Sequence, residues 1–155
     1  METNQLAHWV TMGANFGVLI GLLLLVVELD QNRDMMRAQT RHQIAMGFVD
    51  ISQNLAADEQ LADILYRESS GGELTPRELF RWQMHFNGAL RYWENVHYQY
   101  RVGLYDKVEF EKQLEAVRAG IGNRQLARQY WCQARELFSP EFMAEMDQLL
   151  SPLNC

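Results

Sequence analysis

The stretch LAHWVTMGANFGVLIGLLLLVV, residues 6–27, decides the architecture of this chain. Its 22 residues contain no Asp, Glu, Lys or Arg. As an α-helix they would span about 33 Å at ~1.5 Å per residue, close to the ~30 Å hydrocarbon core of a bilayer. The run from Val18 to Val27 is apolar on every side, so it leaves no face for water.

Two other interpretations of this stretch explain the sequence less well. A buried core helix would need protein on all sides, and 155 residues could hardly surround 22 of them completely. A cleaved signal peptide needs a basic start, but the only charged side chain before the stretch is Glu2, and no small-residue cleavage site follows Val27. We therefore predict a transmembrane helix over residues 6–27, with Trp9 near one interface.

The basic residues around this helix predict its orientation. The preceding flank, residues 1–5, offers only the α-amino group, whereas Arg33, Arg37 and Arg41 follow the helix within about 15 residues. Because positively charged flanks stay in the cytoplasm, we expect residues 1–5 to be a short external N-terminus. Residues 28–155 are then a cytoplasmic α-helical domain.

Three glycines recur four residues apart inside the apolar stretch, at Gly13, Gly17 and Gly21. Each costs roughly 1 kcal/mol against alanine in a helix interior, and together they form one ridge. Helices in lipid associate through close backbone packing, which glycine permits. Glycine is also common in membrane helices in general, but three in register favour an intramembrane packing face. Its partner is a second copy of the chain or a subunit of a larger membrane complex.

Charge and cysteine content limit what the remaining chain does. Nineteen of the 20 acidic residues and all 14 basic residues follow Val27, which gives this part a formal charge of −5. An acidic surface repels phosphate backbones, so we expect no nucleic acid partner. The two cysteines, Cys132 and Cys155, show no short-range pairing pattern, which fits a reducing compartment.

Helix start signals divide the polar part of the chain. Asp58 and Asp106 are suited to N-cap positions, and Thr75, Pro76 and Glu78 combine a cap, a proline at the first helical position and a capping box. The apolar helix is expected to continue past the membrane as far as the first of these caps. Further helices are predicted from 59, 76, 107, 123 and 140, with stops near residues 103, 120 and 150. The predicted fold is all-α, a bundle of four to six helices.

Apolar residues at helical spacing predict the buried faces of these helices. In the first helix beyond the membrane the stripe consists of Ile44, Phe48, Ile51 and Leu55. In the helix that begins at residue 76 it consists of Leu79, Trp82, Phe86, Leu90, Trp93, His97 and Tyr100. The helix from residue 107 has Val108, Phe110, Leu114 and Val117, and the helix from residue 123 has Leu126, Tyr130, Trp131, Ala134 and Phe138.

One set of polar residues borders the aromatic stripe of the helix that begins at residue 76. Asn87, Glu94 and Arg101 are seven residues apart, and His97 lies within the stripe. A partly buried Glu94 needs a partner, for which Arg101, Arg128 and Arg135 are candidates. Two interpretations stay open: an ion pair that fixes two helices, or a polar pocket near Glu94 and His97 that binds a small ligand.

The sequence offers no catalytic constellation. Glu94 and His97 have the Glu-x-x-His spacing of di-iron bundles, but that site needs a second such motif and two more carboxylates. Arginines alternate with the aromatic residues between 81 and 105, but the aromatics follow the helix repeat and are expected to pack in a core. We therefore expect no enzymatic activity, no catalytic residue, no cofactor and no bound metal.

Four segments carry a resemblance to a known family. They are LDQNRDMMRAQT (residues 29–40), LTPRELFRW (74–82), ALRYWENVHYQYRVGLYD (89–106, with Glu94, Tyr98, Gly103 and Leu104) and YWCQARELFSPEF (130–142). In this order after an apolar helix, the chain resembles a family of small uncharacterised bacterial membrane-anchored proteins. The resemblance implies a protein of the bacterial inner (cytoplasmic) membrane. It implies no reaction, and it marks Glu94 and the region of Trp131 as architectural positions.

Together these features predict a non-enzymatic, single-pass membrane protein. We expect it to act as an accessory or scaffold subunit of a membrane protein assembly. The face formed by Gly13, Gly17 and Gly21 would make the contact in the bilayer, and the helical bundle would make the contact in the cytoplasm. The alternative is a membrane-tethered sensor that binds a small ligand near Glu94 and His97.

Overall fold

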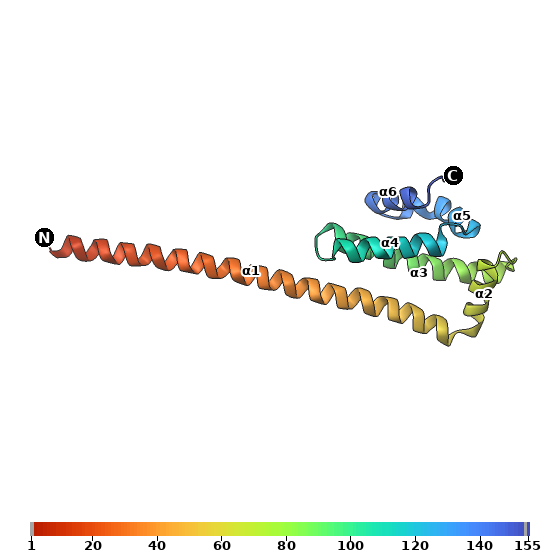
Figure 1. Ribbon diagram of the computed structural model, residues 1–155, viewed down its shortest axis with the longest axis horizontal. Helices are drawn as coiled ribbons and strands as arrows, with labels where there is room; N and C mark the ends of the chain where they lie inside the picture. Colours follow the sequence, from red (N-terminus) through yellow and green to blue (C-terminus); the bar gives the residue numbers. More distant parts are fainter. Residues whose placement is uncertain (1, 154) are drawn as a thin grey trace. The chain divides into compact units, whose positions relative to one another are not determined.

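The longest element of the fold is α1, Glu2–Ala57, a single helix of 56 residues. The computed structural model describes residues 2–153 and 155, and of residues 2–7 it describes the backbone alone. The chain divides into two compact units, residues 1–39 and residues 40–155, and α1 contributes to both (Figure 1). Within the segment 1–5, Met1 lies outside the described residues and the remainder is helical backbone.

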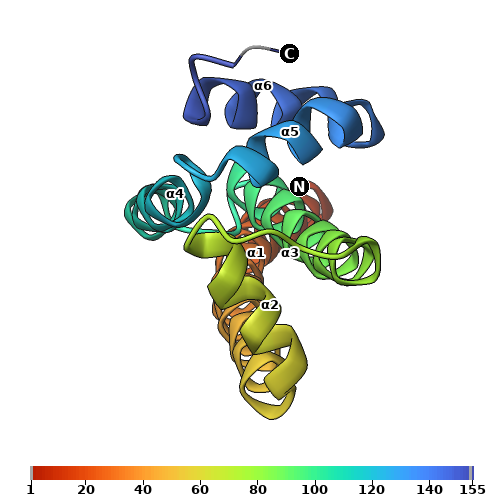
Figure 2. The ribbon, with the colours of Figure 1, turned by 90° about the vertical axis from the view of Figure 1, so that its right-hand side faces the viewer.

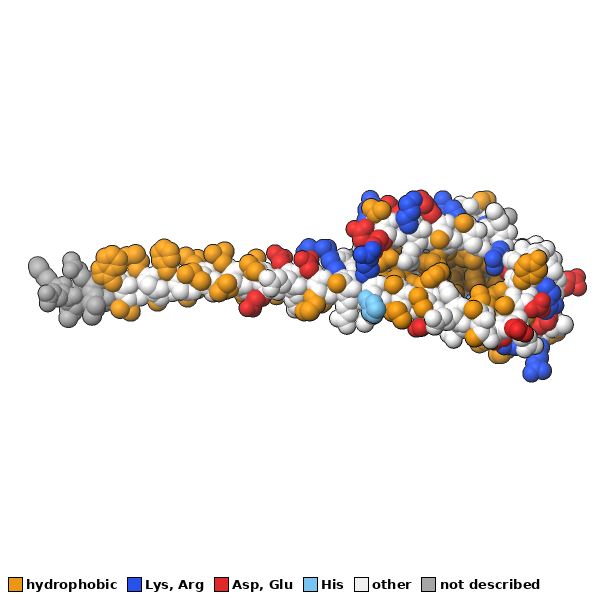
Figure 3. Space-filling model, turned by 60° about the horizontal axis from the view of Figure 1, so that its bottom comes forward, with side chains coloured by type: hydrophobic (Ala, Val, Ile, Leu, Met, Phe, Trp, Pro, Cys, Tyr) orange, Lys and Arg blue, Asp and Glu red, His pale blue; other side chains and the backbone are white. Residues whose placement is uncertain are grey.

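In the first unit, every described side chain from His8 to Gln39 is exposed. The exposed fraction reaches 68% at Trp9 and 67% at Leu23. Figure 3 shows hydrophobic side chains along this stretch of α1, with charged side chains appearing farther along the helix. The helix is long and apolar enough to cross a membrane, and the described protein buries none of its most apolar 18-residue window. The described residues therefore bury none of the apolar stretch of the first unit.

The second unit begins with the last turns of α1, which pack through Ile44. This side chain is 3% exposed, and its carbonyl accepts a 2.9 Å hydrogen bond from the hydroxyl of Tyr92. Gly47 lies against the same ring, because a Cβ there would stand 3.0 Å from Tyr92 Cε2. The predicted burial of Ile44 is confirmed. The prediction for Phe48 is wrong, since Gly47 faces Tyr92 and Phe48 is turned aside with 57% of its surface exposed.

Five more helices complete the second unit. They are α2 (Glu59–Ser69), α3 (Pro76–Arg101), α4 (Lys107–Ile121), α5 (Gln125–Ala134) and α6 (Pro140–Leu149), and a short 3-10 helix, Arg135–Leu137, separates α5 from α6. The described residues contain no strand. The prediction of an all-α fold is confirmed, and the six helices include one long apolar N-terminal helix.

Side-chain caps begin the helices where the sequence predicts them. Asp58 accepts a 3.0 Å hydrogen bond from a backbone N–H of α2. At α3, Thr75 accepts from the backbone N–H of Glu78, and the Glu78 carboxylate accepts from the backbone N–H of Thr75, which completes the capping box. Asp106 caps α4 by accepting from two of its first amides. These starts are encoded locally, within four residues of each cap.

Three details of α4 differ from the sequence prediction. The sequence predicts a capping box of Asp106 with Glu109, but the Glu109 carboxylate forms a 2.6 Å ion pair with Arg41 of α1 and does not return to the cap residue. The helix passes Gly120 and ends at Ile121, with Gly122 as its C-cap. Val108 is 63% exposed because it lies in the first turn, before the buried face begins at Phe110.

The core of the second unit lies between α3 and the pair formed by α5 and α6, with α2 and α4 closing its sides. In Figures 1 and 2, α5 and α6 lie together on one side of α3 and α4. The largest side chains with less than 2% exposure are Trp82, Trp131, Phe142, Ile64, Leu90, Met146, Leu150 and Val96. The predicted stripe of α3 is confirmed as its inner face, because Trp82, Phe86, Leu90 and His97 are all buried.

The cysteines depart from the sequence expectation. Cys132 on α5 and Cys155 form a disulfide, with 5.4 Å between their Cα atoms and 23 residues of sequence separation. The sequence shows no short-range pairing pattern, because two cysteines so distant in sequence meet only when the helices fold back on one another.

Candidate functional site

The glycine face of α1, which we define as Gly13, Gly17 and Gly21, has no partner among the described residues. A Cβ added at any of the three would meet no heavy atom within 4 Å from elsewhere in the described chain. No contact within the described part of the chain therefore requires glycine at these positions. Each glycine weakens a helix interior by roughly 1 kcal/mol against alanine.

The second candidate site, the polar residues on α3, centres on Glu94. One carboxylate oxygen, Oε1, accepts a 2.7 Å hydrogen bond from the backbone N–H of Ser139, the residue that precedes α6. The other, Oε2, accepts a 2.8 Å hydrogen bond from Arg91 Nη1. The Ser139 side chain makes no cap of its own, so Glu94 supplies the N-cap interaction of α6 from a different helix.

The electrostatics of Glu94 agree with this structural role. Burial, the largest single influence, raises the pKa of the carboxyl group, but hydrogen bonds from Ser139 and Arg91 outweigh it and hold the pKa below its ordinary value. Glu94 is therefore a carboxylate at neutral pH, stabilised by a helix terminus and a guanidinium.

Arg91 is the partner that the sequence analysis missed. Besides its bond to Glu94, its Nη2 donates a 3.0 Å hydrogen bond to the carbonyl of Leu137, and its guanidinium lies 4.3 Å from the ring centroid of Phe138. A position three residues before Glu94 on the same helix was the signal available in the sequence. Arg91 fastens the segment before α6 to α3.

The arginines expected to pair with Glu94 bind elsewhere. Arg101 forms a 2.8 Å ion pair with Glu141 in the first turn of α6. Arg128 donates to the carbonyls of Gly122 and Pro152, and Arg135 pairs with Asp147 at 2.8 Å. The three predicted partners were wrong because they lie beside other acceptors once α5 and α6 are packed.

His97 is buried between aromatic rings, with 6% of its surface exposed. Its ring centroid lies 5.9 Å from that of Phe110 on α4 and 5.8 Å from that of Phe142 on α6. Burial is the main cause that lowers the pKa of His97. The imidazole is thus a neutral core group that joins three helices. Asn87 lies half-buried about two turns before Glu94 on the same helix.

Glu94 and Arg101 each bind a residue at the start of α6, namely Ser139 and Glu141, and do not form the wall of a ligand pocket. We call Arg91, Glu94, Arg101, Ser139 and Glu141 the α3–α6 clamp. Four surface cavities of the second unit have volumes of about 670, 690, 730 and 270 Å³, and neither Glu94 nor His97 lines any of them. Within the described part of the chain, no group of three or more His, Cys, Asp or Glu side chains is arranged to hold a metal ion.

A similar fastening joins α5 to α6. Trp131 is fully buried, and its Nε1 donates a 2.8 Å hydrogen bond to Asp147 Oδ1. The other oxygen of Asp147 forms the ion pair with Arg135. The region of Trp131 therefore organises the fold, as the clamp on α3 does.

Comparisons with known proteins give no relative from which to transfer a function. No family model matches the chain, and neither the curated proteins nor the solved structures contain a significant match. The class that the fold defines is an all-α protein with one long apolar N-terminal helix.

Proposed function

We propose that this protein is a non-enzymatic, single-pass anchor of the bacterial inner membrane that serves as an accessory or scaffold subunit. The observation that carries the proposal is the exposed apolar stretch of α1 with its three unpartnered glycines. Every described side chain there is exposed, and the helix is long enough to span a bilayer. Lipid would cover the apolar side chains, and a neighbouring helix would cover the glycine face.

In this proposal the domain after the helix has a binding role. The residues first considered for a ligand pocket, Glu94 and His97, are occupied by contacts that fasten α6 and fill the core. The arginines Arg33, Arg37 and Arg41 favour a cytoplasmic position for this domain. In this proposal the domain presents its surface to a partner while the glycine face makes the contact in the bilayer.

The glycine face is tested by adding bulk to it. We expect Gly17→Ile combined with Gly21→Ile to remove the partner subunit or second copy that the wild-type chain retains in mild detergent. The matched control is Leu19→Ile combined with Leu23→Ile, which introduces the same residue about 200° around the helix. If the glycine variant retains every partner that the control retains, the proposed contact is wrong.

Anchoring and orientation are tested separately. We expect the chain to stay with membranes after an alkaline carbonate wash and to need detergent for extraction. Protease added to intact spheroplasts should leave the domain uncut, and cleavage should follow permeabilisation. A chain that is soluble without detergent would refute the anchor, whereas cleavage in intact spheroplasts would refute only the orientation.

A further inference from the structure

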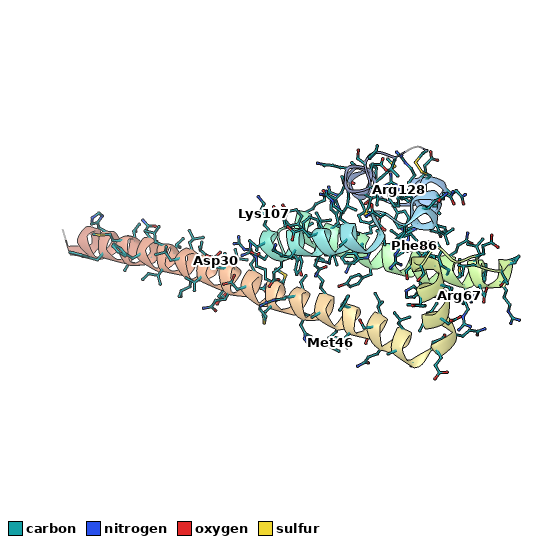
Figure 4. All side chains as sticks on the ribbon, turned by 45° about the vertical axis from the view of Figure 1, so that its right-hand side comes forward. Asp30, Met46, Arg67, Phe86, Lys107 and Arg128 are labelled. Atoms are coloured by element: carbon teal, nitrogen blue, oxygen red, sulfur yellow. A yellow bond between two sulfur atoms is a disulfide. The ribbon has the colours of Figure 1, made fainter. Side chains whose placement is uncertain are left out.

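The disulfide lies at the edge of the second unit, where it holds a short segment against α5. The buried side chains Leu149 and Leu150 anchor the end of α6, with 6% and 1% exposure. Beyond them, Ser151, Pro152 and Cys155 are exposed, and Leu153 is half-buried against the core. Figure 4 shows the disulfide as a yellow bond near the labelled Arg128.

Apart from the disulfide, few contacts hold this segment. Arg128 Nη2 donates a hydrogen bond to the carbonyl of Pro152, and its Nη1 donates a 2.9 Å hydrogen bond to the carbonyl of Gly122. Leu153 adds an apolar contact with the core. The backbone N–H of Ser151 also donates a 3.3 Å hydrogen bond to the carbonyl of Gln148. Two hydrogen bonds and one half-buried side chain compete poorly with the conformational entropy gained when the segment is released.

We propose that Cys132 and Cys155 form a redox-sensitive latch that docks Ser151, Pro152 and Leu153 on α5 when oxidised and releases them when reduced. The inference goes beyond the scaffold function and does not depend on the glycine face. Its setting in the cell rests on the proposed cytoplasmic position of the domain. In that compartment thiols are normally reduced, so a disulfide there is a response to oxidant rather than a permanent cross-link.

The chemistry is thiol–disulfide exchange with a low-molecular-weight disulfide such as oxidised glutathione. One cysteine thiolate attacks a sulfur of the oxidant, which forms a mixed disulfide and expels one small thiolate. The second cysteine thiolate attacks the protein sulfur of that mixed disulfide, which closes the Cys132–Cys155 bond and expels the second small thiolate. The two protein thiols are oxidised, the oxidant is reduced to two thiols, and the two protons pass to solvent or to the released thiolates.

The latch controls one of the surface cavities. The cavity of about 730 Å³ is lined by Leu153 and Cys155 from the docked segment and by polar side chains that include Arg128, Gln129 and Gln133. Release of the segment removes one wall of this cavity. It also removes the Pro152 carbonyl from Arg128, whose guanidinium then offers free donors at the surface. The oxidation state of one bond thus decides whether this polar surface is covered.

The docked state is tested on the full chain in mild detergent by the methyl signals of Leu153. With oxidised glutathione we expect one closed bond and a packed Leu153. After reduction with dithiothreitol, its methyl signals should move to random-coil positions and its order parameter should fall below about 0.6, the range of flexible segments. Signals of the core residue Leu90 should not move.

Two variants separate the latch from other contacts of the segment. Cys132→Ser combined with Cys155→Ser should give the released pattern in both oxidised and reduced buffer. Arg128→Gln should keep the segment docked while the disulfide is closed. The proposal is overturned if oxidised glutathione leaves both thiols free to alkylation, or if reduction leaves Leu153 packed. It is also overturned if reduction disorders Leu90, because the disulfide would then be required for the fold of the whole domain.

The reversible use of the latch is tested in cells. Acid quenching and alkylation should find both thiols free during normal growth and the bond closed after a pulse of the thiol oxidant diamide, with recovery after its removal. A bond that is closed under every condition overturns the switch. The spheroplast protease experiment then reports independently whether the domain lies on the oxidising side of the membrane.

Discussion

Glu94, in the C-terminal half of α3, accepts a 2.7 Å hydrogen bond from the backbone N–H of Ser139, 45 residues later in the chain. This one contact lets a helix of the core cap the N-terminus of α6. The Arg91 guanidinium holds the same carboxylate from the other side at 2.8 Å. The α3–α6 clamp therefore satisfies the start of α6 with a side chain from α3 and at the same time holds the two helices together.

Replacement of Glu94 should destabilise the domain, and the loss should be larger when the new side chain cannot accept a hydrogen bond from the Ser139 N–H. Glu94→Ala leaves the Ser139 N–H without its acceptor and should lower the free energy of unfolding by about 1–3 kcal/mol. Glu94→Gln keeps an acceptor oxygen and should cost less. Urea unfolding followed by near-ultraviolet circular dichroism measures the difference. The control is Glu141→Gln, whose exposed pair with Arg101 should contribute less to stability than the bonds of Glu94.

His97 should make stability fall on mild acidification. Burial, the main influence, lowers its pKa below the ordinary 6.5, although Glu145, Glu141 and Glu94 favour the charged form and Arg101 opposes it. Below pH 6.5 the unfolded chain therefore binds a proton that the folded chain resists.

The contribution of neutral His97 to the stability of the fold is thus complete above pH 6.5 and declines as pH falls toward the lowered pKa of this residue. An imidazole titration followed by NMR should give a midpoint below 6.5 for this residue. His97→Phe should reduce the dependence of unfolding on pH between 7.5 and 5.5. A midpoint at or above 6.5 would contradict the burial that the structure describes.

Ionised Glu78 should contribute to the stability of the fold at low pH. A hydrogen bond from Arg67, followed by bonds from Thr75, lowers the pKa of Glu78 from 4.5 to about 2. The stabilisation is therefore present above pH 4.5 and is lost as pH falls from 4.5 toward 2. Glu78→Gln should flatten the decline in unfolding midpoint over this interval. Glu73→Gln, an exposed carboxylate in the preceding loop, provides the comparison.

Two glycines inside helices of the second unit should respond oppositely to larger residues. A Cβ at Gly88 on α3 meets no described atom within 4 Å, so Gly88→Ala should raise the free energy of unfolding by up to ~1 kcal/mol. A Cβ at Gly47 would approach Tyr92 to 3.0 Å, and the hydroxyl of that ring is held by Ile44. Gly47→Val should therefore destabilise by about 1–3 kcal/mol. Thermal unfolding of the two variants should shift in opposite directions.

The sequence predicted what depends on neighbouring residues. The caps at Asp58, Thr75 and Asp106 involve residues within four positions, and the inner stripe of α3 follows the helical repeat. These features need no knowledge of the tertiary fold. The turn at Gly103 is of the same kind, since its φ of +77° is readily adopted by glycine.

The sequence could not predict partners that meet only after packing. Glu94 binds the backbone N–H of Ser139 because α6 begins beside α3, which no spacing in the sequence indicates. Cys132 and Cys155 likewise meet because α6 reverses the chain between them. The exposure of Phe48 depends on which residue of α1 faces the ring of Tyr92. Each of these is a choice among chemically equivalent contacts, which only the three-dimensional arrangement decides.

The dependence of α6 on α3 also has a consequence for synthesis on the ribosome. The carboxylate that caps α6 belongs to a helix translated 45 residues earlier, while Ser139 provides no side-chain cap of its own. When Ser139 and the first turn of α6 emerge, their acceptor has already left the exit tunnel on a preceding helix. The acceptor that α6 needs is therefore already outside the ribosome when the last helix is able to form.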